Sequence, residues 1–176
     1  MAIKNFWSLN VDEAILVDKL KKELGKNYEV FFPANSQLKD IDLIIYNLKN
    51  KKSSSIQVKG SRTYQTQRSE KIDGNASWNV IKTNSIFKPT NSIDFFIFVI
   101  HEEDLLIDKR KIKQHYLVIP IEDFRKITKN EKDERKTGFY HYSFVVKGKK
   151  VVEINNKKRK KVDFSKYLNN FKLLEK

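Results

Sequence analysis

The pattern of apolar and polar positions along the chain predicts one early helix followed by a series of strands. Residues 11–24 carry apolar side chains at helical spacing, with Leu16, Leu20 and Leu24 in a single stripe. The continuous apolar run over residues 93–100 is typical of a central strand covered on both faces. We therefore predict an α/β fold, with a central mixed sheet flanked by helices and built from strands over residues 28–33, 41–46, 54–59, 94–100 and 115–119.

The remaining segments predict how the rest of the chain surrounds this sheet. A short helix is expected after Pro120, a hairpin over residues 138–154, and a helix in the apolar-spaced segment after Val162. Residues 60–77 lack apolar periodicity and predict a functional loop, and Trp78 is expected to be a core residue. No linker divides the chain, so we predict one domain over residues 1–176, with the segment 138–176 packed on its body.

A polar cluster is predicted at the second and third strands. If these strands form a hairpin, Asp42, Gln57 and Lys59 meet at one edge of the sheet. Magnesium takes about six oxygen ligands, usually one or two carboxylates together with waters and phosphate oxygens. The Asp42 carboxylate, the Gln57 side-chain carbonyl and the Val58 backbone carbonyl supply such oxygens, and Lys59 is placed to stabilise charge on phosphorus. The cluster predicts Mg²⁺, with Mn²⁺ as a substitute, held against a phosphate.

Two further acids bear on this site. Asp40 lies two residues before Asp42 on the same strand face and is its rival, although the apolar run begins beside Asp42. Glu13 lies at the centre of the apolar stripe of the first helix, where an unpartnered carboxylate is costly. The metal or Lys59 is expected to provide that partner. The alternative is a frayed helix end that leaves Glu13 in water, near the favourable helix dipole.

These residues resemble the PD-(D/E)XK nuclease superfamily, which has the restriction-endonuclease-like fold. The family pattern is an acid at the start of one strand, then an acid or glutamine, an apolar residue and a lysine on the next. Asp42 followed by Gln57-Val58-Lys59 matches this pattern, with Ile41 in place of the usual proline. Gln57 is a variant that carries one negative charge fewer than the acid. The family often adds a glutamate from the preceding helix, for which Glu13 is the candidate.

The resemblance implies a magnesium-dependent DNA endonuclease of restriction type. Asp42, Gln57, Val58 and Glu13 would hold the metal, and Lys59 would assist hydrolysis of the phosphodiester bond. Cutting both strands of a duplex would then require a symmetric homodimer. The alternative is a non-cleaving nucleic-acid-binding or regulatory domain on the same fold, with Gln57 marking lost chemistry. An RNA-directed or toxin-like nuclease is a third reading.

The distribution of charge favours a nucleic-acid partner, with double-stranded DNA expected first. The net charge is +14, and residues 51–82 and 147–176 carry seven and eleven basic residues against two and three acidic ones. The alternative is compositional bias, because thirty of the thirty-six basic residues are lysines. The residues expected to contact DNA follow Lys59 or form the late basic run: Ser61, Arg62, Arg68, Lys71, Lys157, Lys158, Arg159, Lys160 and Lys161.

Other features of the sequence argue against disulfide-bonded, zinc-binding, membrane-spanning and secreted proteins. The absence of cysteine excludes disulfides and thiolate metal sites, and the three histidines lack the close spacing of zinc ligands. The longest apolar run, residues 95–100, is too short to cross a bilayer, and the first residues lack the pattern of a signal peptide. These features predict a cytoplasmic protein without membrane contact.

Overall fold

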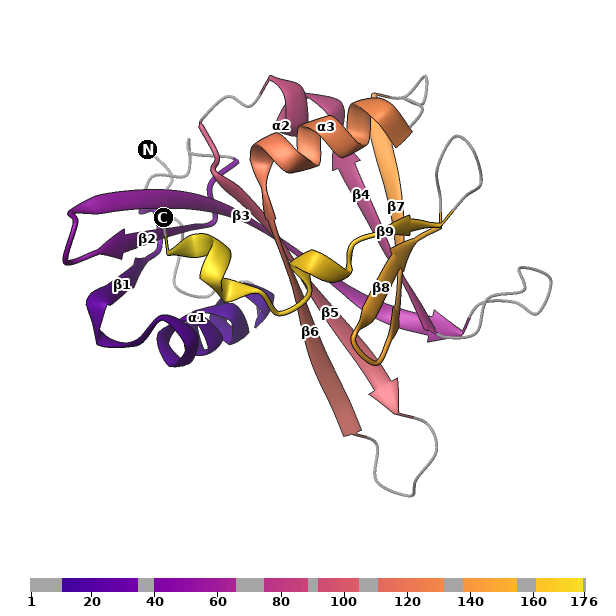
Figure 1. Cartoon of the computed structure of the whole chain (residues 1–176), viewed down its shortest axis with the longest axis horizontal. Helices are drawn as coiled ribbons and strands as arrows, with labels where there is room; N and C mark the ends of the chain where they lie inside the picture. Colours follow the sequence, from indigo (N-terminus) through magenta and orange to yellow (C-terminus); the bar gives the residue numbers. More distant parts are fainter. Residues whose placement is uncertain are drawn as a thin grey trace.

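The computed structural model describes residues 11–34, 40–65, 75–88, 92–104, 111–131, 138–154 and 161–175. Within these ranges the chain has three α-helices and nine strands that belong to one hydrogen-bonded sheet (Figure 1). The predicted mixed α/β class is confirmed. None of the helices in the described ranges has the length and apolar character that a membrane-spanning segment needs.

The first half of the sheet consists of the five predicted strands. Their order is β1-β2-β3-β5-β6, and each neighbouring pair is antiparallel except β3 and β5, which are parallel. Helix α1 (Val11–Leu24) precedes this half and a 3₁₀ turn, Gly25–Asn27, joins it to β1. The strands are β1 (Tyr28–Phe31), β2 (Leu43–Asn47), β3 (Lys52–Gln65), β5 (Phe95–Asp104) and β6 (Lys111–Pro120).

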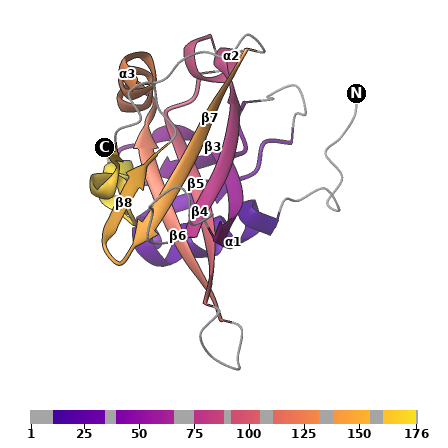
Figure 2. The ribbon, with the colours of Figure 1, turned by 90° about the vertical axis from the view of Figure 1, so that its right-hand side faces the viewer.

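The second half of the sheet grows from the far end of β3. Strand β4 pairs with both β3 and β7, and the order continues through β8 to β9. The predicted hairpin is formed by β7 and β8. Figure 2 shows β4 and β7 in front of β5 and β6. The elements are β4 (Asn75–Lys82), α2 (Thr83–Phe87), α3 (Ile121–Glu131), β7 (Phe139–Lys147), β8 (Lys150–Glu153) and β9 (Val162–Asp163).

Two buried apolar clusters join the helices and the two halves of the sheet. One lies between α1 and the first half of the sheet, where Leu16 and Leu20 pack with Ile56 and Val58. The other lies between the two halves of the sheet and beneath α3, and it is rich in aromatic rings such as Phe98. Side chains alternate along a strand, and Ile56 and Val58 face α1, so Gln57 and Lys59 face away from it. This alternation turns Gln57 and Lys59 toward the second half of the sheet.

Three predictions about individual segments are wrong. The described residues of the segment 60–77 belong to β3 and β4, because pairing with neighbouring strands satisfies their backbone groups despite their polarity. Trp78 is 41% exposed and is not a core residue. The C-terminal segment forms two short 3₁₀ turns, Ser165–Tyr167 and Phe171–Leu174, instead of an α-helix. It still packs on the body, since Tyr167 and Leu174 are buried.

Gly60 allows α1 to approach β3 closely. A Cβ atom at this position would overlap the carboxylate of Asp12, which lies in the first turn of α1. The Oδ1 atom of Asp12 is 2.5 Å from Nε2 of His101 on β5, so this carboxylate has little room to move without losing that contact. The glycine is therefore required by the contact between helix and sheet.

We expect Gly60→Ala to destabilise the protein by about 1–3 kcal/mol, because the added methyl group displaces Asp12 from His101. The same substitution in an Asp12→Ala background is expected to cost much less, since the obstructing carboxylate is gone. Urea unfolding of the four proteins of this double-mutant cycle gives the coupling energy. An equal cost of Gly60→Ala in both backgrounds would contradict the steric explanation.

Candidate active site

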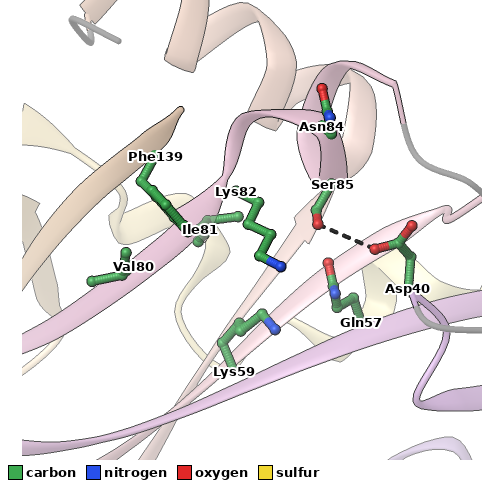
Figure 3. Close-up of a pocket in the computed structure, with 9 residues that line it drawn as sticks. All are labelled: Asp40, Gln57, Lys59, Val80, Ile81, Lys82, Asn84, Ser85 and Phe139. Carbon is green, nitrogen blue, oxygen red and sulfur yellow. Dashed lines mark hydrogen bonds between the residues drawn. The ribbon is translucent and has the colours of Figure 1, made fainter. Parts of the chain in front are cut away.

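A cavity of about 370 Å³ lies where β3 and β4 separate. The two strands pair from Thr63↔Ser77 to Gln65↔Asn75. Before Thr63 on β3 and after Ser77 on β4, the strands diverge. Figure 3 shows side chains of both strands pointing into the wedge between them, with α2 at one end. The lining is polar on the β3 side and more apolar on the β4 side, and consists of Asp40, Gln57, Lys59, Val80, Ile81, Lys82, Asn84, Ser85 and Phe139.

Gln57 is the most unusual residue of this lining. Its side chain is 4% exposed, and its buried Oε1 atom receives no hydrogen bond from any residue that the structure describes. Leaving a buried acceptor without a donor costs about 1–3 kcal/mol. Such a group in a native protein calls for an explanation, and a bound ion or water would supply one. The atom is therefore a candidate ligand for a cation.

The acid in the cavity is Asp40, the rival residue. Asp40 is buried, and its Oδ1 atom accepts a hydrogen bond of 3.1 Å from the Ser85 hydroxyl of α2 (Figure 3). The bond to Ser85 fixes the carboxylate at the α2 end of the cavity, beside Gln57.

Asp42 does not line the cavity, but it is hydrogen-bonded to the part of β3 that carries Gln57 and Lys59. Its Oδ2 atom accepts a 2.7 Å hydrogen bond from the backbone N–H of Val58, and its own N–H donates to the Ile56 carbonyl at 2.9 Å. The carboxylate thus takes the place of a β2 carbonyl at the end of the ladder between β2 and β3. Asp42 fixes the backbone between Gln57 and Lys59.

Two lysines from different halves of the sheet enter the same cavity. Lys59 comes from β3 and Lys82 from the end of β4, and the amino groups of both point into the space between the strands (Figure 3). The only acidic side chain that lines the cavity among the described residues is Asp40, so the lining has a net charge of +1. Sequence reasoning missed Lys82, because the polar segment 60–77 predicted a loop and not the paired ends of β3 and β4. The surplus positive charge favours an anion such as phosphate.

Glu13 lies on α1, which covers the face of the first half of the sheet opposite to the cavity. Its side chain is buried on the inner face of α1, which confirms the inward position and excludes the solvent alternative. Because α1 covers the face of β3 that carries Ile56 and Val58, Glu13 lies on the opposite side of the strand from the side chain of Gln57. Glu13 does not line the cavity.

The residues expected to contact DNA are dispersed. The Ser61 hydroxyl bonds to the backbone C=O and N–H of Trp78 at 3.0 and 3.1 Å, so it joins β3 to β4. Arg62 is exposed and lines a different groove, of about 500 Å³, with Asp12 and His101. Lys161 is exposed just before β9. The other predicted contacts lie outside the described residues: Arg68, Lys71, Lys157, Lys158, Arg159 and Lys160.

The donor atoms of the cavity fit a hard cation. Across the described part of the chain, no three His, Asp or Glu side chains gather as a metal-binding group. The cavity instead offers the Gln57 oxygen and the Asp40 carboxylate. Magnesium and manganese accept such oxygen donors, and magnesium usually completes its shell with waters and phosphate oxygens. The donor set therefore fits Mg²⁺ bound together with a phosphate.

No family model, curated protein or solved structure matches this chain.

Proposed function

We propose that the protein is a magnesium-dependent endonuclease that hydrolyses DNA phosphodiester bonds in the cavity between β3 and β4. The observation that carries this proposal is the buried Gln57 Oε1, which has no donor among the described residues and shares its cavity with Asp40 and two lysines. The order of the first five strands and the residues Gln57-Val58-Lys59 on β3 are compatible with a restriction-endonuclease-like fold, which forms part of the proposal.

In this proposal Gln57 and Asp40 would hold the metal; Asp42 positions Gln57 through its hydrogen bond to the backbone of Val58, and Ser85 positions Asp40. The Val58 carbonyl remains a candidate additional ligand, whereas Glu13 is assigned to the inner face of α1. The metal would act as a Lewis acid and lower the pKa of water. Lys59 donates hydrogen bonds to the phosphate oxygens and stabilises the negative charge that grows on them during attack. Lys82 neutralises the same phosphate from the opposite wall.

The basic character of the chain supports a polyanionic substrate. A net charge of +14 attracts nucleic acid through its phosphates, and binding that depends on such contacts weakens as salt rises. DNA is the proposed substrate, and a restriction-type enzyme that cuts both strands would act as a homodimer. Supercoiled plasmid tests this directly, because one nick relaxes it.

We expect the wild-type protein to nick supercoiled plasmid with Mg²⁺ or Mn²⁺, and a chelator to stop the reaction. Gln57→Ala is expected to lose at least about tenfold in activity, since a ligand to the metal is removed. Gln57→Glu is expected to remain active and to need less Mg²⁺ for half-maximal rate, because it adds a negative charge at the metal. Titration of Mg²⁺ for each variant measures both effects.

Asn130→Ala is the matched control, because it removes an exposed amide at the end of α3, outside the cavity lining. It is expected to cut like the wild type. Unchanged activity and magnesium dependence in Gln57→Ala, with the protein folded, would contradict the assignment of Gln57 as a ligand.

A second candidate function is nucleic-acid binding without cleavage. The net positive lining of the cavity favours it, and so does the lack of a three-residue acidic group among the described residues. This alternative is correct if the folded protein binds plasmid, linear duplex and structured RNA at low salt but cuts none of them with either metal.

A further inference from the structure

The outer face of β4 carries large side chains that the core does not use. Trp78 is 41% exposed and Val80 44% exposed, while Ser77, Asn79 and Ile81 between and beside them are buried. The alternation places Trp78, Val80 and Lys82 on one face of the strand. Val80 and Lys82 line the cavity, so this exposed apolar surface begins at the cavity itself and extends from it to the tryptophan.

The tryptophan is held in place from two sides. Its backbone is fixed to β3 by the Ser61 hydroxyl, which bonds to both the N–H and the C=O of Trp78. Its ring centroid lies 5.1 Å from that of His141 on β7, at an interplanar angle of 57°. The tilted contact uses part of the indole and leaves the exposed remainder for another partner. A fixed, exposed indole loses little conformational entropy when it binds a flat ligand.

We propose that Trp78 stacks an unpaired base of the nucleic-acid strand whose phosphate binds between Lys59 and Lys82. The combination of an aromatic platform with a cationic groove is how proteins hold single strands, since every base has a π face and every nucleotide a phosphate. The proposal rests on the cavity being a phosphate site, as in the proposed function, and names the form of its substrate.

The spacing along β4 favours a single strand over a duplex. Trp78 and Lys82 are four residues apart, which is roughly 13 Å in an extended strand. Bases within an intact duplex are stacked on one another at about 3.4 Å per nucleotide and offer no free face to a side chain. A strand that reaches from the lysines to the indole with one base free must therefore be unpaired there. Single-stranded DNA, or DNA with an unpaired stretch beside the cut, meets this requirement.

The experiment measures binding without cleavage, with chelator present and at low salt. Two labelled oligonucleotides of equal length are compared, one a mixed-sequence single strand and the other fully abasic, so that their phosphates are the same. Trp78→Ala is expected to bind the base-bearing strand about tenfold more weakly or worse, and to bind the abasic strand as the wild type does. Trp78→Phe is expected to retain most of the affinity, because an aromatic face remains.

Fluorescence gives an independent readout. In a Trp7→Phe background Trp78 is the sole tryptophan of the chain, and the base-bearing strand is expected to quench its emission whereas the abasic strand is not. Phe31→Ala is the control, since Phe31 is a 51% exposed aromatic residue on β1, away from the cavity lining. It is expected to leave both affinities unchanged.

The outcomes separate this inference from the nuclease proposal. Equal affinity of wild type and Trp78→Ala for the base-bearing strand, with no quenching, overturns the stacking inference even if the protein cuts plasmid with magnesium. The same result with an exposed Trp78 would point to a protein partner for this face. Base-dependent quenching and a selective loss in Trp78→Ala support stacking even if no metal produces cleavage, in which case only the nuclease proposal fails.

Discussion

Replacement of Lys59 by alanine is expected to abolish magnesium-dependent nicking and to leave DNA binding at low salt within about 1 kcal/mol of the wild type. Removal of a group that stabilises charge in the transition state costs about 10²–10³ in rate. Binding survives because Lys82 and the remaining basic surface still contact phosphates. The rate is measured under single-turnover conditions with plasmid, and binding is measured separately with chelator present.

Lys52→Ala provides the matched control for this prediction. Lys52 is an exposed lysine on the same strand, outside the cavity, so the change in charge is identical. We expect Lys52→Ala to cut at the wild-type rate. If both variants lose activity equally, Lys59 acts as part of a general positive field; if neither does, the cavity is not the site of cleavage.

Truncation of Phe98 to alanine is expected to lower the free energy of unfolding by about 3–5 kcal/mol, the largest effect on stability that we predict. Phe98 on β5 is fully buried. Its ring centroid lies between 5.0 and 6.4 Å from the rings of four other residues, which come from β5, α3 and β7: Phe96, Phe124, Tyr142 and Phe144. The lost ring would leave a void between the two halves of the sheet. Urea unfolding monitored by circular dichroism gives the value.

The half-exposed Phe31 again serves as the control. Phe31→Ala removes the same number of atoms from the surface of β1 and is expected to cost less than about 1 kcal/mol, because little apolar area is lost from the interior. A Phe98→Ala protein as stable as Phe31→Ala would mean that the aromatic cluster does not join the two halves of the sheet.

The five strands of the first half could be predicted because their burial follows directly from local pattern. The run from Phe95 to Ile100 is buried throughout, as its continuous apolarity predicts. The early helix is equally local, since the buried Leu16, Leu20 and Leu24 form one stripe. For these elements, the side chains that enter the core are those that the period of the element places together.

Strand β4 shows why pattern fails elsewhere. Its apolar residues Trp78 and Val80 are exposed while the polar Ser77 and Asn79 are buried, the reverse of the usual alternation. The buried pair is stabilised by a hydrogen bond of 3.4 Å from the Asn79 amide to the Ser77 hydroxyl. A contact of this kind depends on the strands on either side, and no local rule distinguishes it from the expected arrangement.

The C-terminal segment has the spacing of buried residues that is typical of an α-helix, but it does not form one. Phe164, Tyr167, Phe171 and Leu174 are buried at helical spacing, yet an α-helix is interrupted at Asn169, which has φ 51° and donates its N–H to the Tyr116 carbonyl of β6. Short 3₁₀ turns repeat at a similar interval and present the same residues to the core. The period of burial was therefore predicted, and the type of helix was not.

The sequence predicts two of the charged and polar residues of the candidate site, Gln57 and Lys59, but not its full composition. Gln57 and Lys59 share the cavity because residues two apart on a strand face the same way. The choice between Asp40 and Asp42 depends on where β2 begins, and the position of Lys82 depends on the pairing of β4 with β3 through residues whose polarity predicted a loop. The boundaries of strands and the pairing of strands through polar residues are two features that a local pattern does not encode.

Strand β3 has a consequence for any attempt to divide this protein. Its residues supply hydrogen-bonding partners to β2, β5 and β4, so one continuous stretch of backbone belongs to both halves of the sheet. A fragment-complementation reporter or a chimaera with an exchanged half must therefore keep residues 52–65 intact. A break inside that stretch would separate the Gln57 wall from the support that Ser61 gives to the opposite wall, and reassembly would have to restore both at once.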